Sequence, residues 1–449
     1  MSTNNISCFN IFNKFYLGGK MKKIILSTFS SIFLLFSFNA SAVTEIVWWD
    51  LYGGGDGEKL QNMVDAFNGD HPDINITKTT QEWGPPFYAK LEMSSAIGEQ
   101  PDIALYHMSR IQMAKGTNVF TPLTIEELAS VGIHEEDYYP AYWNKGKGDE
   151  EGTMFVVPYD SPIIVFHWNK TAMEKAGLVD EDGFFSTCDG TPEAFKNCLQ
   201  ALKDVGYEYP ISSYNTNAYM TYWWWISLVK QMGGEIWTEE GGWCPDHGCK
   251  QAMEYYASLV TEGYMPANIG DDSYSGFLSG EYAIHISGGW SMSPVIEKSR
   301  NATLGFEYAV TRIPQLGADN GILAAHAHAS GFMIPNSDKN PISAEKKQIA
   351  LDIIGWMTRN NIYWANAGHY IPYKPTANSL MYKSLWPSGA FADVGDIAFF
   401  EPDHPVFGIA GPIYDVLGSW ILGAVNGDIS ADEFVENTQM EINAIVDSM

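Results

Sequence analysis

Short apolar runs alternate with amphipathic segments near the start of the chain, and this alternation constrains the fold most. Three runs read as strands: EIVWW (45–49), DINIT (73–77) and DIALY (102–106). Apolar side chains recur at helical spacing between the first two: Leu60, Met63, Val64 and Phe67. Residues 85–97 read as a second helix, because prolines begin it and Gly98 follows it. The order βαβαβ predicts a parallel sheet with helices on its faces.

Two loops of this unit, residues 50–55 and 107–110, follow strands, and ligands bind beyond the carboxyl ends of strands in such sheets. The first loop contains Gly53, Gly54 and Gly55. A dinucleotide fingerprint needs a third glycine where Glu58 stands, and a P-loop needs a lysine that is missing. We therefore expect these glycines to let a ligand approach the backbone closely, with Tyr52 and Trp49 beside it.

The N-terminal region has the pattern of a secretory signal peptide. Two lysines precede the apolar residues 24–38, and Ala40-Ser41-Ala42 is a small-residue cleavage site. The apolar run is shorter than the ~20 residues of a membrane span. We expect residues 1–20 to be a non-native extension, residues 21–42 to be the signal peptide, and cleavage after Ala42. Whether Met1 or Met21 is the true start stays open.

Charge and cysteine content fit an exported small-molecule protein. The net charge of −28 opposes binding to nucleic acid or an anionic membrane. Four cysteines follow the signal peptide, and an even number in an exported chain indicates disulfides. We pair near neighbours, Cys188 with Cys198 and Cys244 with Cys249. The alternative is a metal site, since His247 lies between the second pair.

A second α/β region follows the first. Residues 155–168 form a long apolar stretch that fits a strand passing from one lobe to another. Helices are predicted at 193–205, 414–425 and 431–446 and a strand at 282–286, while residues 214–232 are an aromatic-rich segment. Aromatic residues make up 14% of the chain, and several lie in predicted loops beside polar residues. Sugars match such a lining, because rings pack on their C–H faces while polar groups bind their hydroxyls.

Catalytic and metal motifs are missing from the sequence. His326 and His328 share one face of a strand, but no third ligand has convincing spacing. No G-x-S-x-G or H-E-x-x-H motif occurs. We therefore expect no enzyme activity, no metal and no cofactor.

Six segments in order resemble the extracellular solute-binding proteins of bacterial sugar ABC transporters, the group that includes maltose-binding protein. They are AFNGDHPDINI (66–76), GEQPDIALY (98–106), FVVPYDSPIIVFHWNKTAMEKAGL (155–178), GEYAIHISGGW (280–290), SGFMIPNSDKNP (330–341) and NGDISADEFVENTQMEINAIV (426–446). The resemblance implies an α/β, two-lobed periplasmic-binding-protein fold of type II, with the ligand cleft between lobes joined by hinge strands. Lobe 1 would comprise 43–158 plus 310–365, and lobe 2 would comprise 159–309 plus 366–449.

The resemblance also implies lobe crossings near 158–161, 309–314 and 360–372. It places Ser109 and Arg110 at cleft positions, although maltose-binding protein has an acid where Ser109 stands. Together with the loop aromatics, the predicted ligand-binding residues are Trp49, Tyr52, Gly53, Gly54, Gly55, Trp83, Ser109, Arg110, Tyr159, Asp160, Trp223, Trp224, Gly289, Trp290, His328, Ser330, Tyr370 and Tyr414.

These observations predict a monomeric periplasmic protein that captures a mono- or oligosaccharide and delivers it to the membrane permease of an ABC transporter. The alternatives are a binding protein for another solute, such as a polyamine, an iron complex or glycerol phosphate, and a secreted glycan-acting enzyme. The identity, size, linkage and charge of the sugar are left open, as are its affinity and the aromatic rings that stack on it. Arg110 would be the partner of a charged sugar such as a uronate.

Overall fold

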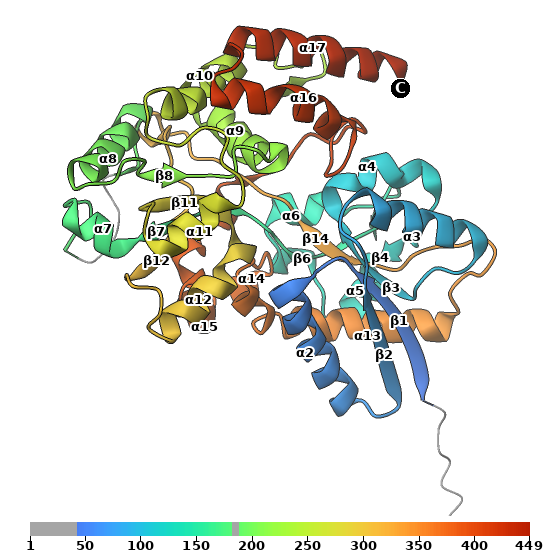
Figure 1. The fold of residues 1–449 in the computed structure, drawn as a ribbon. Helices are drawn as coiled ribbons and strands as arrows, with labels where there is room; N and C mark the ends of the chain where they lie inside the picture. The colour runs from blue at the N-terminus through green and yellow to red at the C-terminus, as the bar shows by residue number, and fades with distance from the viewer. Residues whose placement is uncertain (1–42, 182–187) are drawn as a thin grey trace, which may run out of the picture. The chain divides into compact units, whose positions relative to one another are not determined.

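The predicted βαβαβ unit is present at the start of the chain (Figure 1). The computed structural model describes residues 43–181 and 188–449, so the predicted extension and signal peptide lie outside the described residues. The unit consists of β1 (Thr44–Asp50), α2 (Gly54–Asp70), β2 (Ile74–Thr80), α3 (Pro85–Ile97) and β3 (Ile103–His107). Helix α2 buries the four predicted apolar side chains, so the apolar spacing correctly predicted the buried face of this helix.

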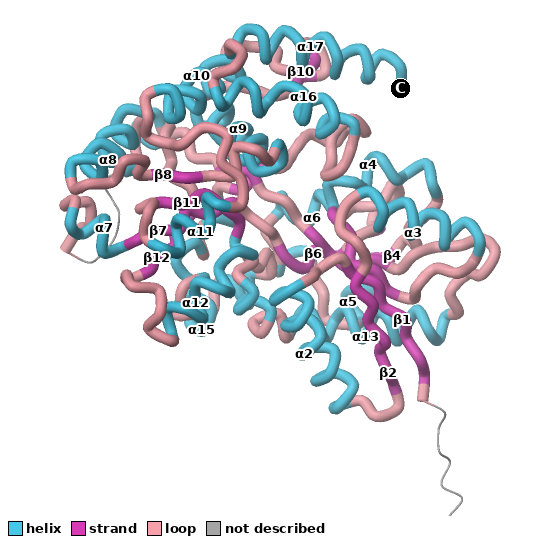
Figure 2. The backbone as a smooth tube through the Cα atoms, viewed as in Figure 1, coloured by secondary structure: helices cyan, strands magenta, loops and turns pink. Residues whose placement is uncertain are grey.

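The first sheet has the strand order β2-β1-β3-β14-β6, where β14 is Ser330–Met333 and β6 is Val157–Asp160. β1 and β3 are parallel, whereas β14 is antiparallel to both β3 and β6. The sheet is therefore mixed rather than parallel throughout, because β14 runs antiparallel to both of its neighbours. In Figure 2, β1, β2 and β3 lie side by side, and α13 (Ala344–Arg359) contacts α2.

The second sheet has the order β12-β7-β11-β8. Its strands are β12 (Tyr308–Arg312), β7 (Ile164–Asn169), β11 (Ile284–Gly288) and β8 (Ile211–Ser212). β7 pairs antiparallel with β11 and β12, while β8 is parallel to β11. The larger helices of this region are α8 (Pro192–Asp204), α9 (Ala218–Gln231), α10 (Gly248–Thr261), α16 (Pro412–Asn426) and α17 (Ala431–Ser448). α8, α16 and α17 overlap predicted helices, whereas α9, which lies in the aromatic-rich segment, and α10 were not predicted.

The strand pairing shows the chain passing between the two sheets at two places. The long apolar stretch divides into β6 in the first sheet and β7 in the second. β12 lies in the second sheet and β14 in the first, so residues 313–329 connect them, and the predicted boundary at residue 310 falls inside β12. Near the third predicted crossing, Tyr370 forms a β-bridge with Ser161. The lobe ranges themselves remain a prediction.

Shorter elements complete the described chain: α4 (Ile111–Ala114), β4 (Leu123–Thr124), α5 (Ile125–Ser130), α6 (Pro140–Lys145), β5 (Thr153–Met154), α7 (Lys170–Lys175), β9 (Trp237–Thr238), β10 (Gly242–Trp243), α11 (Asp272–Ser279), α12 (Met292–Arg300), β13 (Ala325–His326), α14 (Lys374–Ala377), α15 (Leu380–Lys383) and β15 (Ala398–Phe399). The structure joins Cys188 to Cys198 and Cys244 to Cys249, with Cα atoms 5.9 and 5.7 Å apart. Within the described ranges, no helix has the length and apolar composition that crossing a bilayer requires.

Candidate functional site

The loop between β1 and α2 is anchored at the end of its strand. The buried carboxylate of Asp50 pairs with Lys78 and accepts a hydrogen bond of 2.8 Å from the backbone N–H of Tyr52. The Tyr52 hydroxyl donates to the carboxylate of Asp160, at 3.0 and 2.8 Å from its two oxygens. Gly53 is the N-cap of α2, and a Cβ there would meet no atom within 4 Å, so open space lies over the backbone. Open space also surrounds the Cβ position of Gly54, and the binding role of these glycines stays a prediction.

A cavity of about 490 Å³, which we call the inner cavity, opens beside this loop. Its size falls within the usual range of small-molecule sites, about 300–1,000 Å³. Five aromatic side chains line it: Tyr52, Trp83, Tyr219, Trp223 and Trp290. Its polar lining consists of Asp56, His107, Asn217, His328 and His369. The remaining lining residues are Leu51, Gly53, Pro162, Met220 and Ile409.

Residues of both sheet regions contribute to the inner cavity. Tyr52 follows β1 and Trp83 precedes α3, whereas Tyr219 and Trp223 lie on α9. The rings of Trp83 and Tyr219 meet edge to face with centroids 5.6 Å apart. This contact joins the two regions, so a movement between them would open or close this side of the cavity.

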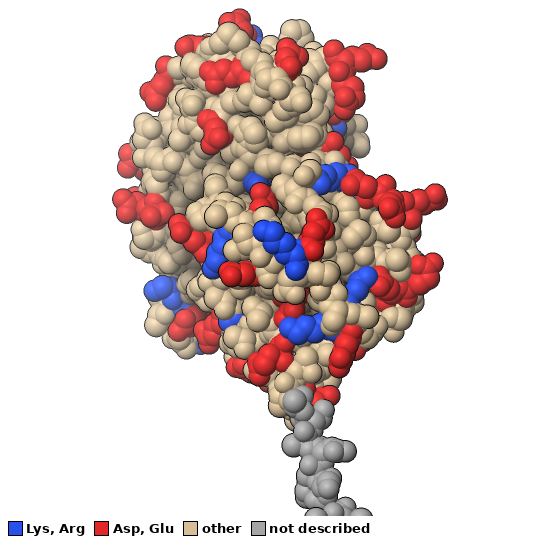
Figure 3. Space-filling model, turned by 90° about the vertical axis from the view of Figure 1, so that its right-hand side faces the viewer, with Lys and Arg blue, Asp and Glu red and all other residues tan. Residues whose placement is uncertain are grey.

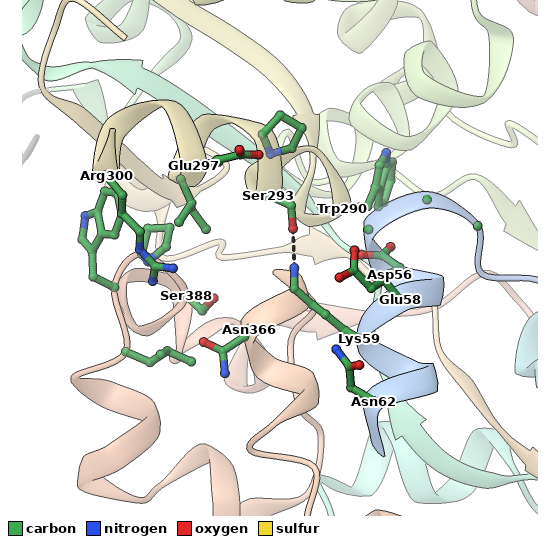
Figure 4. A pocket seen from close by; sticks show the side chains of 18 of the residues that line it. Asp56, Glu58, Lys59, Asn62, Trp290, Ser293, Glu297, Arg300, Asn366 and Ser388 are labelled. Atoms are coloured by element: carbon green, nitrogen blue, oxygen red, sulfur yellow. Dashed lines mark hydrogen bonds between the residues drawn. The ribbon is translucent and has the colours of Figure 1, made fainter. Parts of the chain in front are cut away.

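A second hollow of about 740 Å³, the outer groove, meets the inner cavity where Gly53, Asp56 and Trp290 line both. It is polar and lies between α2, α12 and the segment around Ser388 (Figure 4). Lys59 of α2 points toward Ser293 of α12 and donates a hydrogen bond to its hydroxyl. Trp290 therefore lies at the boundary between the inner cavity and the outer groove.

Two carboxylates enclose one imidazole at the inner cavity. Nε2 of His369 lies 3.0 Å from Asp56, and Nδ1 lies 2.8 Å from Asp160. Burial alone would lower the pKa of His369, but the charges of Asp56 and Asp160 outweigh it and raise the pKa to about 10. His369 is therefore an imidazolium at neutral pH. Asp160 also accepts a hydrogen bond of 2.9 Å from Trp364 Nε1, whereas the second oxygen of Asp56 has no described partner.

The other two histidines of the inner cavity are neutral. Burial lowers the pKa of His107 to about 4, and its Nδ1 shares a hydrogen bond with the Tyr88 hydroxyl. Burial, reinforced by neighbouring His326, holds the pKa of His328 well below its usual range. The His328 side chain is almost fully buried, and its Nε2 has no hydrogen-bond partner among the described residues. An unpaired buried nitrogen is costly, so a ligand or water at this atom would stabilise the site.

Eight of the predicted residues line these hollows. Tyr52, Trp83, Trp223 and His328 face the inner cavity, Gly54 and Gly55 face the outer groove, and Gly53 and Trp290 face both. The glycine pair before Trp290 serves packing: a Cβ at Gly288 would overlap the Trp290 ring, and one at Gly289 would overlap the Gly368 carbonyl. Gly289 is thus a packing residue that places Trp290 rather than a lining residue.

Ser109 and Arg110 line neither hollow. The Arg110 guanidinium donates to the carbonyls of Ile409 and Ala410 at 2.9 and 3.1 Å, and it lies 3.9 Å from the ring centre of Tyr88. The Ser109 hydroxyl accepts a hydrogen bond from the Ile409 N–H at 3.2 Å. Both residues hold the segment that brings Ile409 to the cavity, and the Arg110 guanidinium is buried away from both hollows.

The other predicted residues lie behind the lining or away from it. Trp49 has Lys90 over its ring, Tyr159 and Trp224 pack in the core, and Ser330 and Tyr370 are buried. Asp160 and Tyr414 do not line the cavity but hydrogen-bond residues that do. Asp160 accepts a hydrogen bond from Tyr52, and the Tyr414 hydroxyl accepts one of 2.9 Å from Trp223 Nε1. Trp48 is fully buried against Phe332, so neither of the paired tryptophans lines a hollow.

Five polar or aromatic residues that line the inner cavity were absent from the prediction: Asp56, His107, Asn217, Tyr219 and His369. Position could have indicated two of them, because His107 ends β3 and Asp56 follows the glycine loop. No local pattern marks His369, whose partner Asp56 is 313 residues away.

His326 and His328 do lie together, with ring centroids 4.6 Å apart. Across the described ranges, however, no three His, Cys, Asp or Glu side chains gather as metal ligands.

A model of the bacterial extracellular solute-binding protein family matches residues 53–361. The sn-glycerol-3-phosphate-binding periplasmic protein UgpB of Yersinia pestis is 28% identical over 156 residues, which cover 33% of this chain and 34% of the relative. UgpB of Rhizobium meliloti is 24% identical over 191 residues, 41% of each chain. The matched part thus spans about a third to two-fifths of these curated relatives.

Among solved structures, the sugar-binding protein MalE from Xanthomonas citri has a TM-score of 0.74 at 18% identity, with 90% of this chain and 98% of that chain covered. UgpB from Mycobacterium tuberculosis, in complex with glycerophosphocholine, has a TM-score of 0.73 at 19% identity, with the same coverage. These similarities confirm the predicted α/β periplasmic-binding-protein fold. Because the family model covers well over half of the chain, this protein belongs to the bacterial extracellular solute-binding protein family.

Proposed function

We propose that this protein captures a sugar in the inner cavity and delivers it to the transmembrane permease of an ABC transporter. The observation that carries the proposal is the lining itself: five aromatic rings around a cavity of about 490 Å³, with amide, carboxylate and imidazole groups among them. Rings pack on the C–H faces of a sugar, and the polar groups bind its hydroxyls. Membership of a solute-binding family supports a binding protein rather than an enzyme.

Two polar atoms without a described protein partner, together with the Trp290 ring, would hold such a sugar. The free oxygen of Asp56 and the unpartnered Nε2 of His328 are available to hydroxyl groups. Trp290 lies where the two hollows meet, so its ring would stack on a sugar unit at that point. Stacking on α9 and hydrogen bonds from α2 would stabilise the closed arrangement over an open one, which is how a ligand shifts a conformational population.

Binding of glycerol phosphate is the second candidate, because the curated relatives are named for sn-glycerol 3-phosphate. A phosphate ester needs cationic partners, and among the described residues that line the inner cavity none is Lys or Arg, while both ring nitrogens of the His369 imidazolium already face carboxylates. The lining therefore favours the sugar. We further propose that the protein acts in the periplasm, on the basis of the predicted signal peptide with cleavage after Ala42, and that it is a monomer.

A thermal-shift screen over a glycan panel, followed by calorimetry on the hits, tests the proposal. We expect stoichiometric binding of at least one glycan without turnover, and release of a product would instead support an enzyme. Trp290→Ala should weaken binding of that glycan more than tenfold. Trp420→Ala is the matched control, since Trp420 is also half-buried but lines neither hollow. Equal affinities of these two folded variants would remove Trp290 from the site.

A further inference from the structure

The inner cavity and the outer groove are continuous at the glycine loop. Gly53, Asp56 and Trp290 line both hollows. A Cβ at Gly53 or Gly54 would meet no atom within 4 Å, so the backbone is uncovered where the hollows meet. With volumes of about 490 and 740 Å³, each hollow alone has the size of a small-molecule site. A ligand confined to the inner cavity would therefore leave a second, connected hollow unused.

The Trp290 ring at this junction is held in place by the protein. A Cβ at Gly288 would overlap the ring, so the ring lies directly on the backbone there. Trp223 meets it edge to face, with the ring centroids 5.9 Å apart. A side chain that is already fixed loses little conformational freedom when a ligand binds. Trp290 is thus suited to hold a sugar unit at the passage between the two hollows.

The outer groove has a lining of its own for a second sugar unit. Trp386 lines this groove and is 44% exposed, and its ring also meets Tyr308 edge to face. The amides of Asn62 and Asn366 lie in the same groove (Figure 4), and neither has a hydrogen-bond partner among the described residues. Rings pack on the C–H faces of sugars, while amides bind their hydroxyls. Trp386 and the two amides therefore supply both kinds of contact.

The charges of the outer groove favour a neutral ligand. Lys59 and Arg300 line it together with Glu58 and Glu297, so both signs are present. A hydroxyl group both donates and accepts hydrogen bonds, and it can therefore pair with either sign. The net charge of −28, with acidic side chains spread over the face shown in Figure 3, also opposes an anionic glycan. A neutral unit rich in hydroxyls fits this groove best.

We propose that the ligand is a neutral oligosaccharide that occupies both hollows and crosses between them over the glycine loop. One unit stacks on Trp290 at the junction. A further unit lies in the outer groove against Trp386, Asn62 and Asn366. The inference rests on the proposed function and specifies the size and charge of its substrate. A monosaccharide would fill the inner cavity alone and would bind more weakly, because it forgoes every contact in the outer groove.

A length series tests the inference. Calorimetry compares one to four units of α-1,4-linked glucose, β-1,4-linked glucose, β-1,4-linked xylose and β-1,4-linked mannose, with α-1,4-linked galacturonate as the anionic comparison. In the series that bind, we expect affinity to rise about tenfold or more from the monosaccharide to the tetrasaccharide. A monosaccharide that binds as tightly as its tetrasaccharide overturns the inference and leaves the sugar proposal standing. Tighter binding of galacturonates than of every neutral series also overturns it. If no glycan binds, the sugar proposal fails as well.

Two variants remove contacts that only the outer groove offers. For Trp386→Ala and Asn62→Ala, the ratio of tetrasaccharide to monosaccharide affinity should fall by about fivefold and about threefold. Asn62→Ala should fold normally, since Asn62 is exposed on α2 and alanine is the best helix former. Trp420→Ala is again the control, and its ratio should match that of the wild type. Unchanged ratios in folded Trp386→Ala and Asn62→Ala would remove the outer groove from the site.

A third variant obstructs the passage itself. Gly53 has an extended backbone, with φ −93° and ψ −179°, which any residue can adopt, and threonine is a common N-cap. In Gly53→Thr the new side chain would enter the open space where the hollows meet. The ratio of tetrasaccharide to monosaccharide affinity should therefore fall by about tenfold. A wild-type ratio in the folded variant would show that the ligand does not cross the glycine loop.

Discussion

We expect the free energy of unfolding of this protein to fall as the pH rises above neutral, because His369 then loses its proton. The imidazolium lies 3.0 Å from Asp56 and 2.8 Å from Asp160, and its side chain is only 2% exposed. Replacing it with glutamine leaves both carboxylates without their cation. The Tyr52 hydroxyl and Trp364 Nε1 still donate to Asp160, but no other described side chain pairs with Asp56. Removing one partner of a buried ion pair typically costs about 3–5 kcal/mol.

The pH window follows from the direction of the pKa shift. The pKa of His369 is about 10 in the folded protein, against the ordinary histidine value of 6.5 that applies to the unfolded chain. A raised folded-state pKa contributes stability that is complete below pH 6.5 and is lost as the pH rises toward 10. The loss is about 1.4 kcal/mol per pH unit, or roughly 5 kcal/mol over the window.

Urea unfolding measured at intervals between pH 6 and 10 tests this expectation. The difference in unfolding free energy between the wild type and His369→Gln should be largest near pH 6 and should shrink toward pH 10. His134→Gln is the control, because His134 lies outside the cluster, and its difference from the wild type should stay small across the range. Parallel pH profiles for the wild type and His369→Gln would refute the charge pairing of His369 with Asp56 and Asp160.

Three further outcomes are expected. The pKa of His107 is lowered to about 4, so the unfolding free energy of the wild type should fall by about 1.4 kcal/mol per pH unit from this residue between pH 6.5 and 4, and His107→Gln should have a shallower acid slope. Replacing both Cys188 and Cys198 with serine should lower the unfolding free energy by roughly 3 kcal/mol in urea titrations, the entropy of closing a short loop. Arg110→Leu leaves the Ile409 carbonyl without its charged donor and should cost about 2–3 kcal/mol, measured the same way.

The secondary structure could be predicted wherever its cause is local. Prolines at one end and Gly98 at the other bound α3, whose observed limits are the predicted residues 85–97. The apolar spacing in α2 likewise located its buried face. β14 could not be placed in this way, because its position between β3 and β6 depends on pairing with segments more than 150 residues earlier. The predicted parallel sheet was therefore incomplete.

The same limit applies to the site. Tyr52 and Gly53 follow β1 directly, so topology alone brings them to the cavity edge. Arg110 stands in an equivalent position after β3 but turns toward carbonyls about 300 residues away. Its orientation depends on unpaired acceptors in a loop that sequence spacing cannot position. A polar residue after a strand is thus a candidate lining residue, and distant hydrogen-bond partners decide whether it becomes one.

Backbone contact between two glycines couples the aromatic and the charged parts of the cavity. Gly289 precedes Trp290, and Gly368 precedes His369. A Cβ on either glycine would overlap the carbonyl oxygen of the other, so only glycine allows the two chains to approach this closely. A side chain at either position would displace the Trp290 ring and the His369 imidazolium together. Ring stacking and charge pairing in this cavity therefore share one backbone contact, and selection on either function would retain both glycines.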